Sequence, residues 1–117
     1  MTEVARRGGQ ALEIFADDLF FGNSATILSA ALRNRLPTVV PEPEMVEAGG
    51  LMAYEALDES YERMVALIDK ILRGAKPGQL PIEQPTRFQL FINLKTAKAL
   101  GLAIPQSLLL RADEVIR

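Results

Sequence analysis

The sequence predicts one α/β domain of three layers, in which helices cover both faces of a doubly wound, mostly parallel sheet of about four strands. Two observations favour this fold class. Short apolar runs of strand length alternate with segments of helical period, which is typical of parallel strands joined by right-handed helical crossovers. The chain has 117 residues and is 49% hydrophobic and 24% charged. We therefore expect residues 1–117 to share one core without disulfides or metals.

The first half of the chain is predicted to form two strands and two helices. The apolar run over 11–16 has the length of a buried strand, and 17–23 is predicted to be a loop. Apolar residues with helical spacing predict a helix over 24–36, which ends before a proline. A β-branched strand over 38–40 and a short helix over 43–48, which ends at a glycine pair, complete this half.

The second half is predicted to add two strands and three helices. A third strand over 51–54 precedes the clearest helical period of the chain, over 58–73. After a proline-rich connector come a fourth strand over 88–92 and a helix over 94–100, which begins after an asparagine cap and ends at a glycine. Apolar spacing predicts a last helix over 105–117.

The helix over 58–73 has a wide apolar face. Asp58 and Glu59 at its start and Lys70 and Arg73 at its end match the helix dipole. An exposed apolar face of this width favours self-association, for example as a homodimer. The apolar residues of this face are Tyr61, Met64, Val65, Ile68, Ile71 and Leu72.

Composition excludes several classes of function. The chain has no cysteine and no histidine, which removes thiolate nucleophiles, Cys-ligated zinc and the usual general base. We therefore expect no catalytic activity, no metal and no cofactor. The net charge of −2 argues against a nucleic-acid partner, which would require a basic surface. No apolar run reaches the length of a membrane span, and MTEVARRGGQ at the start is not a secretory signal, so the chain as written would be cytoplasmic.

The loops that follow the first three strands are the candidate binding region. Ligands of open parallel sheets sit outside the carboxyl ends of the strands, which selects the loops 17–23, 41–43 and 54–57. In the first loop, Asp17 stands close to the ring of Phe20, a combination that suits an ammonium group on an amphipathic ligand. The alternative is that Asp17 or Asp18 caps the following turn and that Phe20 and Phe21 belong to the core.

Two further residues lie beside the other predicted strand ends. Glu42 follows the second strand, where it either faces a ligand or supplies the acidic charge that a helix N-terminus favours. Tyr54 ends the third strand, where it either stacks on a ligand or fills a groove. Both alternatives remain open for each residue.

The acidic pair Asp17 and Asp18 also resembles the phosphoacceptor site of response-regulator receiver domains. That chemistry requires a third Asp at the end of the third strand, where this chain has Glu55, and a Lys after the last strand. Lys95 falls inside a predicted helix instead. An enzymatic or phosphoacceptor function is therefore the weakest hypothesis.

Longer motifs carry a more specific resemblance. The GGLMAY turn over 49–54, the connector KPGQLPIEQPT over 76–86 and INLKTAKALG over 92–101 resemble the C-terminal part of ABC-transporter substrate-binding proteins. These are periplasmic or lipid-anchored receptors of the tryptophan and tyrosine uptake group. The upstream ALEIFADDLFF and LRNRLPTVVPEPEMVEAGG are similar to the same family, so the resemblance extends over nearly the whole chain.

This resemblance implies a fold, a function and partners. It implies the C-terminal, Rossmann-like lobe of a two-lobe periplasmic binding protein of type I, of which the N-terminal lobe is missing here. It also implies a periplasmic location, a small amino-acid-like solute as ligand and an ABC permease as partner. The alternative is a truncated, stand-alone lobe that folds and self-associates but has no transport function.

The resemblance also assigns candidate ligand-binding residues. It matches Asp17 to the acid that binds the ammonium group of the ligand, and places Phe20, Asn23 and Tyr54 along the same cleft edge, with Glu42 as a further candidate. One position departs from the family pattern. Family members have glycine after the tyrosine of the Gly-Gly-Leu-Met-x-Tyr turn, whereas this chain has Glu55, which lacks the backbone freedom of glycine at a predicted hinge.

Overall fold

The computed structural model describes residues 1–56, 60–82 and 84–117. The chain divides into two compact units. The first, here called the sheet unit, comprises Met1–Glu55 and Gln89–Arg117. The second, the α5 unit, comprises Ala56–Phe88. Each unit is described by itself.

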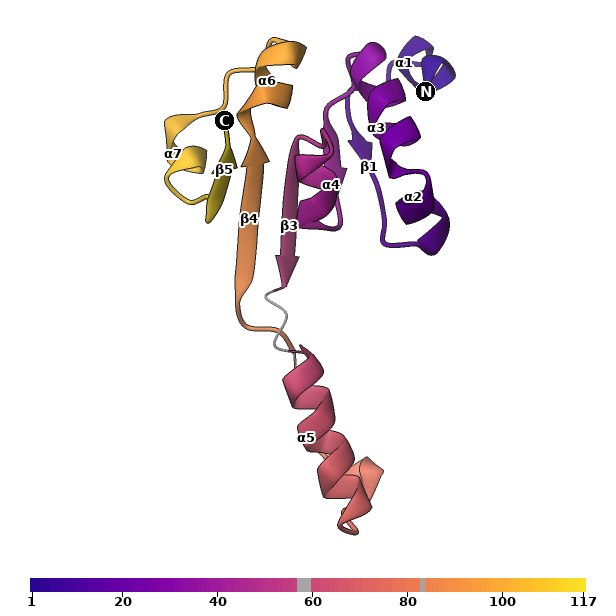
Figure 1. The fold of residues 1–117 in the computed structure, drawn as a ribbon, viewed down its shortest axis with the longest axis vertical. Helices are drawn as coiled ribbons and strands as arrows, with labels where there is room; N and C mark the ends of the chain where they lie inside the picture. Colours follow the sequence, from indigo (N-terminus) through magenta and orange to yellow (C-terminus); the bar gives the residue numbers. More distant parts are fainter. Residues whose placement is uncertain (57–59, 83) are drawn as a thin grey trace. The chain divides into compact units, whose positions relative to one another are not determined.

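Five strands form one sheet in the order of the sequence, β1-β2-β3-β4-β5 (Figure 1). The strand β1 is parallel to β2, β2 is parallel to β3, and β4 is parallel to β5. The arrows of β3 and β4 point in opposite directions in Figure 1, and the backbone N–H of Asn93 donates to the carbonyl of Leu51 at 2.9 Å. The predicted, mostly parallel α/β sheet is therefore confirmed. The strands are β1 (Leu12–Glu13), β2 (Thr38–Val40), β3 (Met52–Ala56), β4 (Phe88–Asn93) and β5 (Glu114–Ile116).

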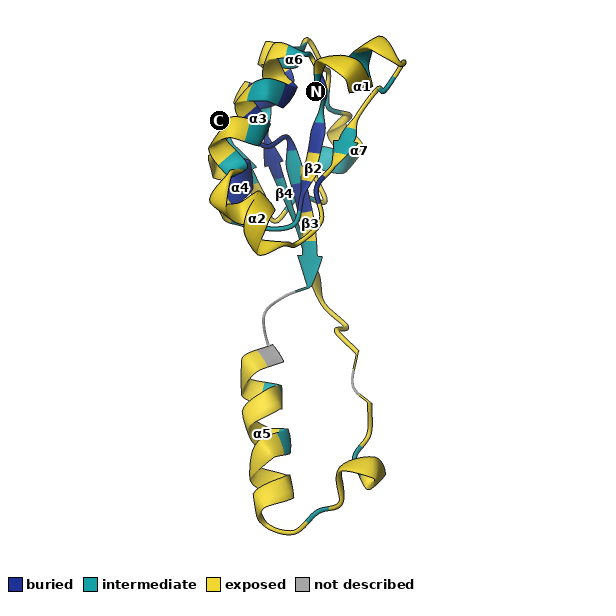
Figure 2. Cartoon of the chain, turned by 90° about the vertical axis from the view of Figure 1, so that its right-hand side faces the viewer, coloured by how far each residue is buried: buried dark blue, intermediate teal, exposed yellow. Residues whose placement is uncertain are grey.

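Helices flank both faces of this sheet. Figure 2 shows α3 and α4 on one face and α7 on the other, as a three-layer fold requires. The helices α3 and α4 connect β1 to β2 and β2 to β3, and because these connections proceed in one direction across the sheet they cover the same face. The helices of the sheet unit are α1 (Thr2–Arg6), α2 (Asp18–Gly22), α3 (Ser24–Arg33), α4 (Pro43–Glu47), α6 (Leu94–Leu100) and α7 (Gln106–Leu109).

The core lies between the sheet and the α3–α4 layer. Leu28 of α3 and Met45 and Val46 of α4 pack with alternate residues of the strands, among them Val40 and Ala53. Alternate strand residues face the same side of a sheet, so the apolar runs of the sequence supply one buried row per strand. This packing fixes the strands whose ends are considered below.

A buried polar cluster joins the end of β4 to the end of α4. The side-chain amide of Asn93 donates to the carbonyl of Val46 at 2.8 Å, and its oxygen accepts from the backbone N–H of Thr96 at 3.0 Å. The Thr96 hydroxyl donates to the carbonyl of Gly49 at 3.0 Å. The predicted asparagine cap of the helix after the fourth strand is therefore confirmed, and the same side chain also anchors α4.

Three segments of the sheet unit differ from the sequence predictions. The strand predicted over 11–16 is shorter, because β1 comprises only Leu12–Glu13. The stretch 17–23, predicted as a loop, contains the short helix α2. The predicted last helix over 105–117 is wrong beyond α7, because the chain instead forms β5. Asp113 makes two bonds to Leu90 of β4, its N–H to the carbonyl at 2.9 Å and its carboxylate to the N–H at 2.8 Å. Pairing with β4 therefore outweighs the helical spacing of the apolar residues.

The α5 unit consists of one helix and an extended return. The helix α5 (Ser60–Leu72) confirms the strongest helical period of the sequence, while Asp58 and Glu59, predicted to begin it, lie outside the described residues. A 3-10 turn, η1 (Pro77–Gln79), lies in the predicted connector. In the described part of this unit no residue is buried, and the apolar face of α5 is exposed (Figure 2). None of the described helices is long and apolar enough to cross a membrane.

Candidate functional site

The carboxyl ends of β1, β2 and β3 meet at one edge of the sheet, here called the strand-end edge. Glu13 of β1 pairs with Val39 of β2, and Val39 pairs with Met52 of β3, all in parallel register. Glu42 and Tyr54 therefore stand within a few residues of the same rung of the ladder. The loop predicted over 54–57 lies in β3 as far as residue 56, and residue 57 falls outside the described part of the chain.

The segment after β1 places Asp17 and Asn23 at the two ends of α2. The Asp17 carboxylate accepts from the backbone N–H of Leu19 at 2.8 Å, and the Asn23 amide donates to the Leu19 carbonyl at 2.8 Å. The capping alternative for Asp17 is therefore what the structure shows. A carboxylate has two oxygens and both residues are exposed, so capping is compatible with a contact to a ligand.

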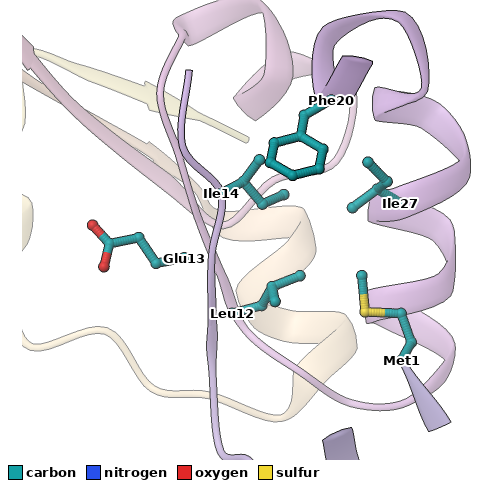
Figure 3. A pocket seen from close by; sticks show the side chains of 6 residues that line it. All are labelled: Met1, Leu12, Glu13, Ile14, Phe20 and Ile27. Atoms are coloured by element: carbon teal, nitrogen blue, oxygen red, sulfur yellow. The ribbon is translucent and has the colours of Figure 1, made fainter. Parts of the chain in front are cut away.

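Phe20 lies at the middle of α2, three residues from both Asp17 and Asn23, which puts all three on one side of the helix. Its ring covers an open apolar hollow of about 190 Å³ beside β1. Figure 3 shows the side chains of Phe20, Ile14 and Ile27 pointing toward one another, whereas Glu13 points away. The hollow is smaller than common small-molecule pockets, which start at about 300 Å³. Phe20 thus packs partly on the core and remains 38% exposed.

Glu42 and Tyr54 occupy the next two strand ends. Glu42 is half-buried at the N-cap of α4, followed by Pro43 in the first turn, so it stands at the positive end of a short helix. The Tyr54 side chain is 62% exposed on β3. Glu55 lies in β3 as well, in an extended backbone that needs no glycine, so the departure from the family pattern costs the strand no strain.

Two exposed apolar residues at this edge were not among the predicted site residues. Phe15 is 68% exposed and Leu19 is 67% exposed. The sequence placed Phe15 inside a buried strand, but β1 ends at Glu13 and the chain then turns toward α2. The available signal was the alternation of the strand, because a buried Ile14 predicts that its neighbour faces the other side.

The geometry disagrees with a phosphoacceptor site. Lys95 lies in the first turn of α6, just after β4. Because β4 runs opposite to β3, this lysine lies at the other edge of the sheet from Asp17. Among the described residues, no group of three or more acidic side chains is arranged to hold a metal ion. The strand-end edge instead presents carboxylates, an amide and exposed rings, which suit non-covalent binding of a small amphipathic molecule.

Comparison with known proteins agrees with this geometry. A family model described as ABC transporter substrate binding protein matches residues 1–116. A comparison with curated protein sequences finds no match. The family match extends over both the sheet unit and the α5 unit.

Three solved structures are similar to this chain. A conserved domain protein from Vibrio cholerae has a TM-score of 0.82 at 22% identity and covers 97% of this chain. An ABC domain in complex with L-Trp from Streptococcus pneumoniae has a TM-score of 0.80 at 29% identity and covers 98%. A substrate binding protein with adhesive properties from Clostridium difficile, in its ligand-free, open form, has a TM-score of 0.63 at 21% identity and covers 99%.

The chain spans 38%, 39% and 41% of the length of these three structures, respectively. The first and third, at less than 25% identity, show the fold alone. The family model extends over nearly the whole sequence and agrees with the motifs found in it. The chain therefore belongs to the ABC transporter substrate binding protein family, whose members bind solutes and are not enzymes.

Proposed function

We propose that this chain is one lobe of a receptor for a small amino-acid-like solute, and that the solute binds at the strand-end edge. The observation that carries the proposal is the convergence of Asp17, Glu42 and Tyr54 at the carboxyl ends of three parallel strands. Family membership supports it, and so does the structure at 29% identity that is in complex with L-Trp.

Each candidate residue has a distinct role in this proposal. The Asp17 carboxylate attracts the ammonium group of the ligand while still capping α2, because a second oxygen is available for the contact. The rings of Phe20 and Tyr54 contact the ligand side chain, and exposed Phe15 extends this apolar wall. Asn23 and Glu42 supply polar groups at its rim. The proposed binding is non-covalent, so no bond is made or broken.

The proposal requires a second wall. A binding cleft commonly buries 70–90% of a small ligand, whereas a single sheet edge leaves much of it in water. The matched structures are more than twice as long as this chain. We therefore infer that residues 1–117 act together as the C-terminal lobe, that an N-terminal lobe closes the cleft, and that an ABC permease receives the solute on the periplasmic side of the membrane.

Titration with L-tryptophan, monitored by NMR of the backbone amides, tests this proposal. We expect millimolar affinity and shifts that cluster around Asp17 and Tyr54. The variant Asp17→Asn keeps an oxygen that can cap α2 but loses the charge, so the affinity should fall about tenfold. Asp18→Asn is the matched control, because it removes a neighbouring charge that has no assigned role.

The alternative function is a stand-alone lobe without transport activity, which the exposed apolar face of α5 favours. The absence of amide chemical-shift changes at millimolar tryptophan and at millimolar tyrosine would support this alternative. Equal losses of affinity in Asp17→Asn and Asp18→Asn would contradict the role of Asp17, because they would show a general effect of charge.

A further inference from the structure

The edge of the sheet opposite the strand-end edge is rich in basic side chains. The strands β1, β2 and β3 begin there, and β4 and β5 end there, because β4 runs opposite to β3. Helix α1 precedes β1, the turn after α3 leads into β2, and α6 follows β4. Figures 1 and 2 both show α1 and α6 at this same end of the sheet unit. These segments carry six exposed cations, here called the basic edge: Arg6, Arg7, Arg33, Arg35, Lys95 and Lys98.

The acidic side chains are distributed in the opposite way. Few carboxylates lie near the basic edge: Glu3 pairs with Arg6 at 2.6 Å, Glu47 ends α4, and Glu13 lies further along in β1. The sequence has no Lys or Arg over 8–32 or over 36–62. The net charge of −2 therefore averages two ends of opposite sign. The segments after β1 and β2, at the strand-end edge, contain Asp17, Asp18, Glu42 and Glu44.

Local structure accounts for only part of the basic edge. Arg6, Arg33 and Lys98 lie in the last turns of their helices, where the helix dipole favours a cation. Lys95 lies in the first turn of α6, where the dipole disfavours one. Within the described part of the chain, the Lys95 side chain makes no hydrogen bond or ion pair that would offset this cost. The position of Lys95 is therefore not explained by the stability of its own helix.

Arg35 has an unfavourable backbone conformation. Its φ of 54° is left-handed, and among the described residues no other residue except glycine has a positive φ. It follows the Asn34 cap of α3, and the next N–H, of Leu36, donates to the Ala31 carbonyl at 2.9 Å. Glycine usually occupies such a position at a helix end. An exposed arginine that is retained despite local strain points to a contact outside the chain's own fold.

We propose that the basic edge binds the surface of an anionic lipid membrane, where its cations contact the phosphates of several head groups at once. Helix α1 lies beside β1 and α6 beside β4, and these strands are three spacings, about 14 Å, apart in the sheet. A single small anion is too small to contact both groups of cations, whereas a membrane presents phosphates across the whole distance.

The family and the position of the basic edge favour a membrane over other polyanions. The chain belongs to a family of transporter components, and a transporter acts in a membrane. The second wall inferred above closes on the strand-end edge, which leaves the opposite edge uncovered; in this respect the inference rests on the proposed function. Solute and membrane would then be bound at opposite ends of the same strands, so neither excludes the other.

Co-sedimentation of the full chain with lipid vesicles tests this proposal. At low ionic strength, we expect binding to mixed phosphatidylcholine and phosphatidylglycerol vesicles and none to pure phosphatidylcholine vesicles. About 1 M salt should release the protein, because the screening length falls to about 3 Å. Equal binding to neutral vesicles, or binding to neither kind, would overturn the proposal. Equally tight binding to a DNA duplex would also overturn it, because it would show affinity for any polyanion.

The four lysines of the chain supply a matched pair of double variants. Lys95→Gln with Lys98→Gln should weaken binding to anionic vesicles at least about tenfold, because each basic residue near such a surface contributes about fivefold. Lys70→Gln with Lys76→Gln removes the same charge from the α5 unit and should leave binding nearly unchanged. Equal losses in the two double variants would overturn the proposal, because they would show an effect of net charge alone.

Arg35→Gly separates binding from stability. Glycine relieves the left-handed backbone, so the thermal midpoint should rise by about 2–5 °C while vesicle binding weakens about fivefold. Unfolding could not explain a weaker binding of this more stable variant. Arg35→Lys keeps both the charge and the backbone conformation, so it should bind vesicles as the unchanged chain does. Unchanged vesicle binding of Arg35→Gly would overturn the role of Arg35.

The orientation on the membrane is tested by NMR with anionic bicelles that contain a gadolinium-labelled lipid. The amide signals of α6 and of Arg35 should broaden most, and those of Asp17 and Asp18 least, because the strand-end edge faces away from the lipid. The reverse order would overturn the proposal. Asp17→Asn should bind vesicles no more weakly than the unchanged chain. A failed tryptophan titration with intact vesicle binding would therefore contradict the solute site alone.

Discussion

Asn93 connects β4, α4 and the start of α6 through the hydrogen bonds of one side chain. It is buried, and its amide makes a bond at each end, to the carbonyl of Val46 and to the N–H of Thr96. The first bond holds the end of α4, whose N-terminus carries Glu42 at the strand-end edge. A residue at one edge of the sheet thereby positions a candidate site residue at the other.

We predict that Asn93→Ala lowers the free energy of unfolding by about 2–3 kcal/mol, because it removes a helix cap and leaves a buried carbonyl without its donor. Urea denaturation measures this change. Asn34→Ala is the matched control, since Asn34 makes one bond to the Ala30 carbonyl in a half-buried position, and its loss should cost less than about 1 kcal/mol. Equal losses in the two variants would contradict the structural role assigned to Asn93.

Asp17 allows its capping role to be separated from its proposed binding role. Asp17→Ala removes the oxygen that accepts from the Leu19 N–H and should cost about 1 kcal/mol of stability. Asp17→Asn keeps such an oxygen and should leave the thermal midpoint nearly unchanged while binding weakens. If Asp17→Asn lowers the stability as much as Asp17→Ala does, the carboxylate charge itself stabilises α2. A weaker affinity of Asp17→Asn for the ligand would then not show a contact between Asp17 and the ligand.

At the scale of the elements, the turn between α4 and β3 is closely packed. A Cβ at Gly50 would lie 2.8 Å from the Met45 carbonyl oxygen and 3.0 Å from a Val40 methyl group. Gly49 has a positive φ of 116°, a conformation that other residues rarely adopt. The two glycines are therefore required for different reasons. Gly50 leaves room for the Met45 carbonyl and the Val40 side chain, and Gly49 adopts a backbone conformation that other residues rarely adopt.

We predict that Gly50→Ala destabilises the sheet unit by about 1–3 kcal/mol through this overlap. Gly49→Ala should cost about 1 kcal/mol or more through backbone strain. Gly22→Ala is the control: among the described residues nothing lies within 4 Å of its Cβ position, and alanine suits α2, so stability should stay equal or rise slightly. Thermal unfolding compares all three, and a neutral Gly50→Ala would show that α4 can shift.

The sequence predicted well the elements that are decided by local pattern. The helices α3 and α5 have strong apolar periods, and β2 is short and β-branched, so these elements were found near their observed positions. The strand β5 was missed because its bonds to β4, including those from Asp113 to Leu90, join residues 23 apart and leave no local signal. The helix α2 was missed for a different reason: its five residues are too few to show a helical period, although the Asp17 cap that begins it is a local signal.

In the candidate site too, some features follow from the local sequence pattern and others depend on tertiary packing. The parallel order of the first three strands was predicted correctly, because it follows from short strands alternating with helices. Binding at the edge where these strands end stays a prediction. The exposure of Phe15 and the contact of Phe20 with an apolar hollow depend on where β1 ends and the chain turns. Such turns are set by tertiary packing, which the spacing of residues in sequence does not record.

At the scale of the whole molecule, the two units differ in how they are stabilised. Among the residues that the structure describes, all the buried ones belong to the sheet unit. The helix α5 has 13 residues, and its apolar side is exposed. A helix of this length is only marginally stable in water without a partner surface. The stability of the α5 unit should therefore depend on what covers the exposed apolar residues of α5.

We predict that the amides of α5 exchange with deuterium much faster than those of β2 and β4 in dilute protein, because they open without unfolding the core. The amides of β2 serve as the internal control. Uniform protection across both units at low concentration would contradict this difference in stability.

The opposite directions of β3 and β4 have a consequence for modularity. The backbones of Leu51 and Asn93 are joined by a hydrogen bond. The end of β3 at Ala56 and the start of β4 at Phe88 each lie five residues from this bond, so the two strand ends are neighbours in the sheet. Neighbouring antiparallel strands need no more than a two-residue hairpin to join them. The intervening segment is thus an insertion that could be excised and replaced by Asn-Gly, leaving a miniature sheet with its strand order intact.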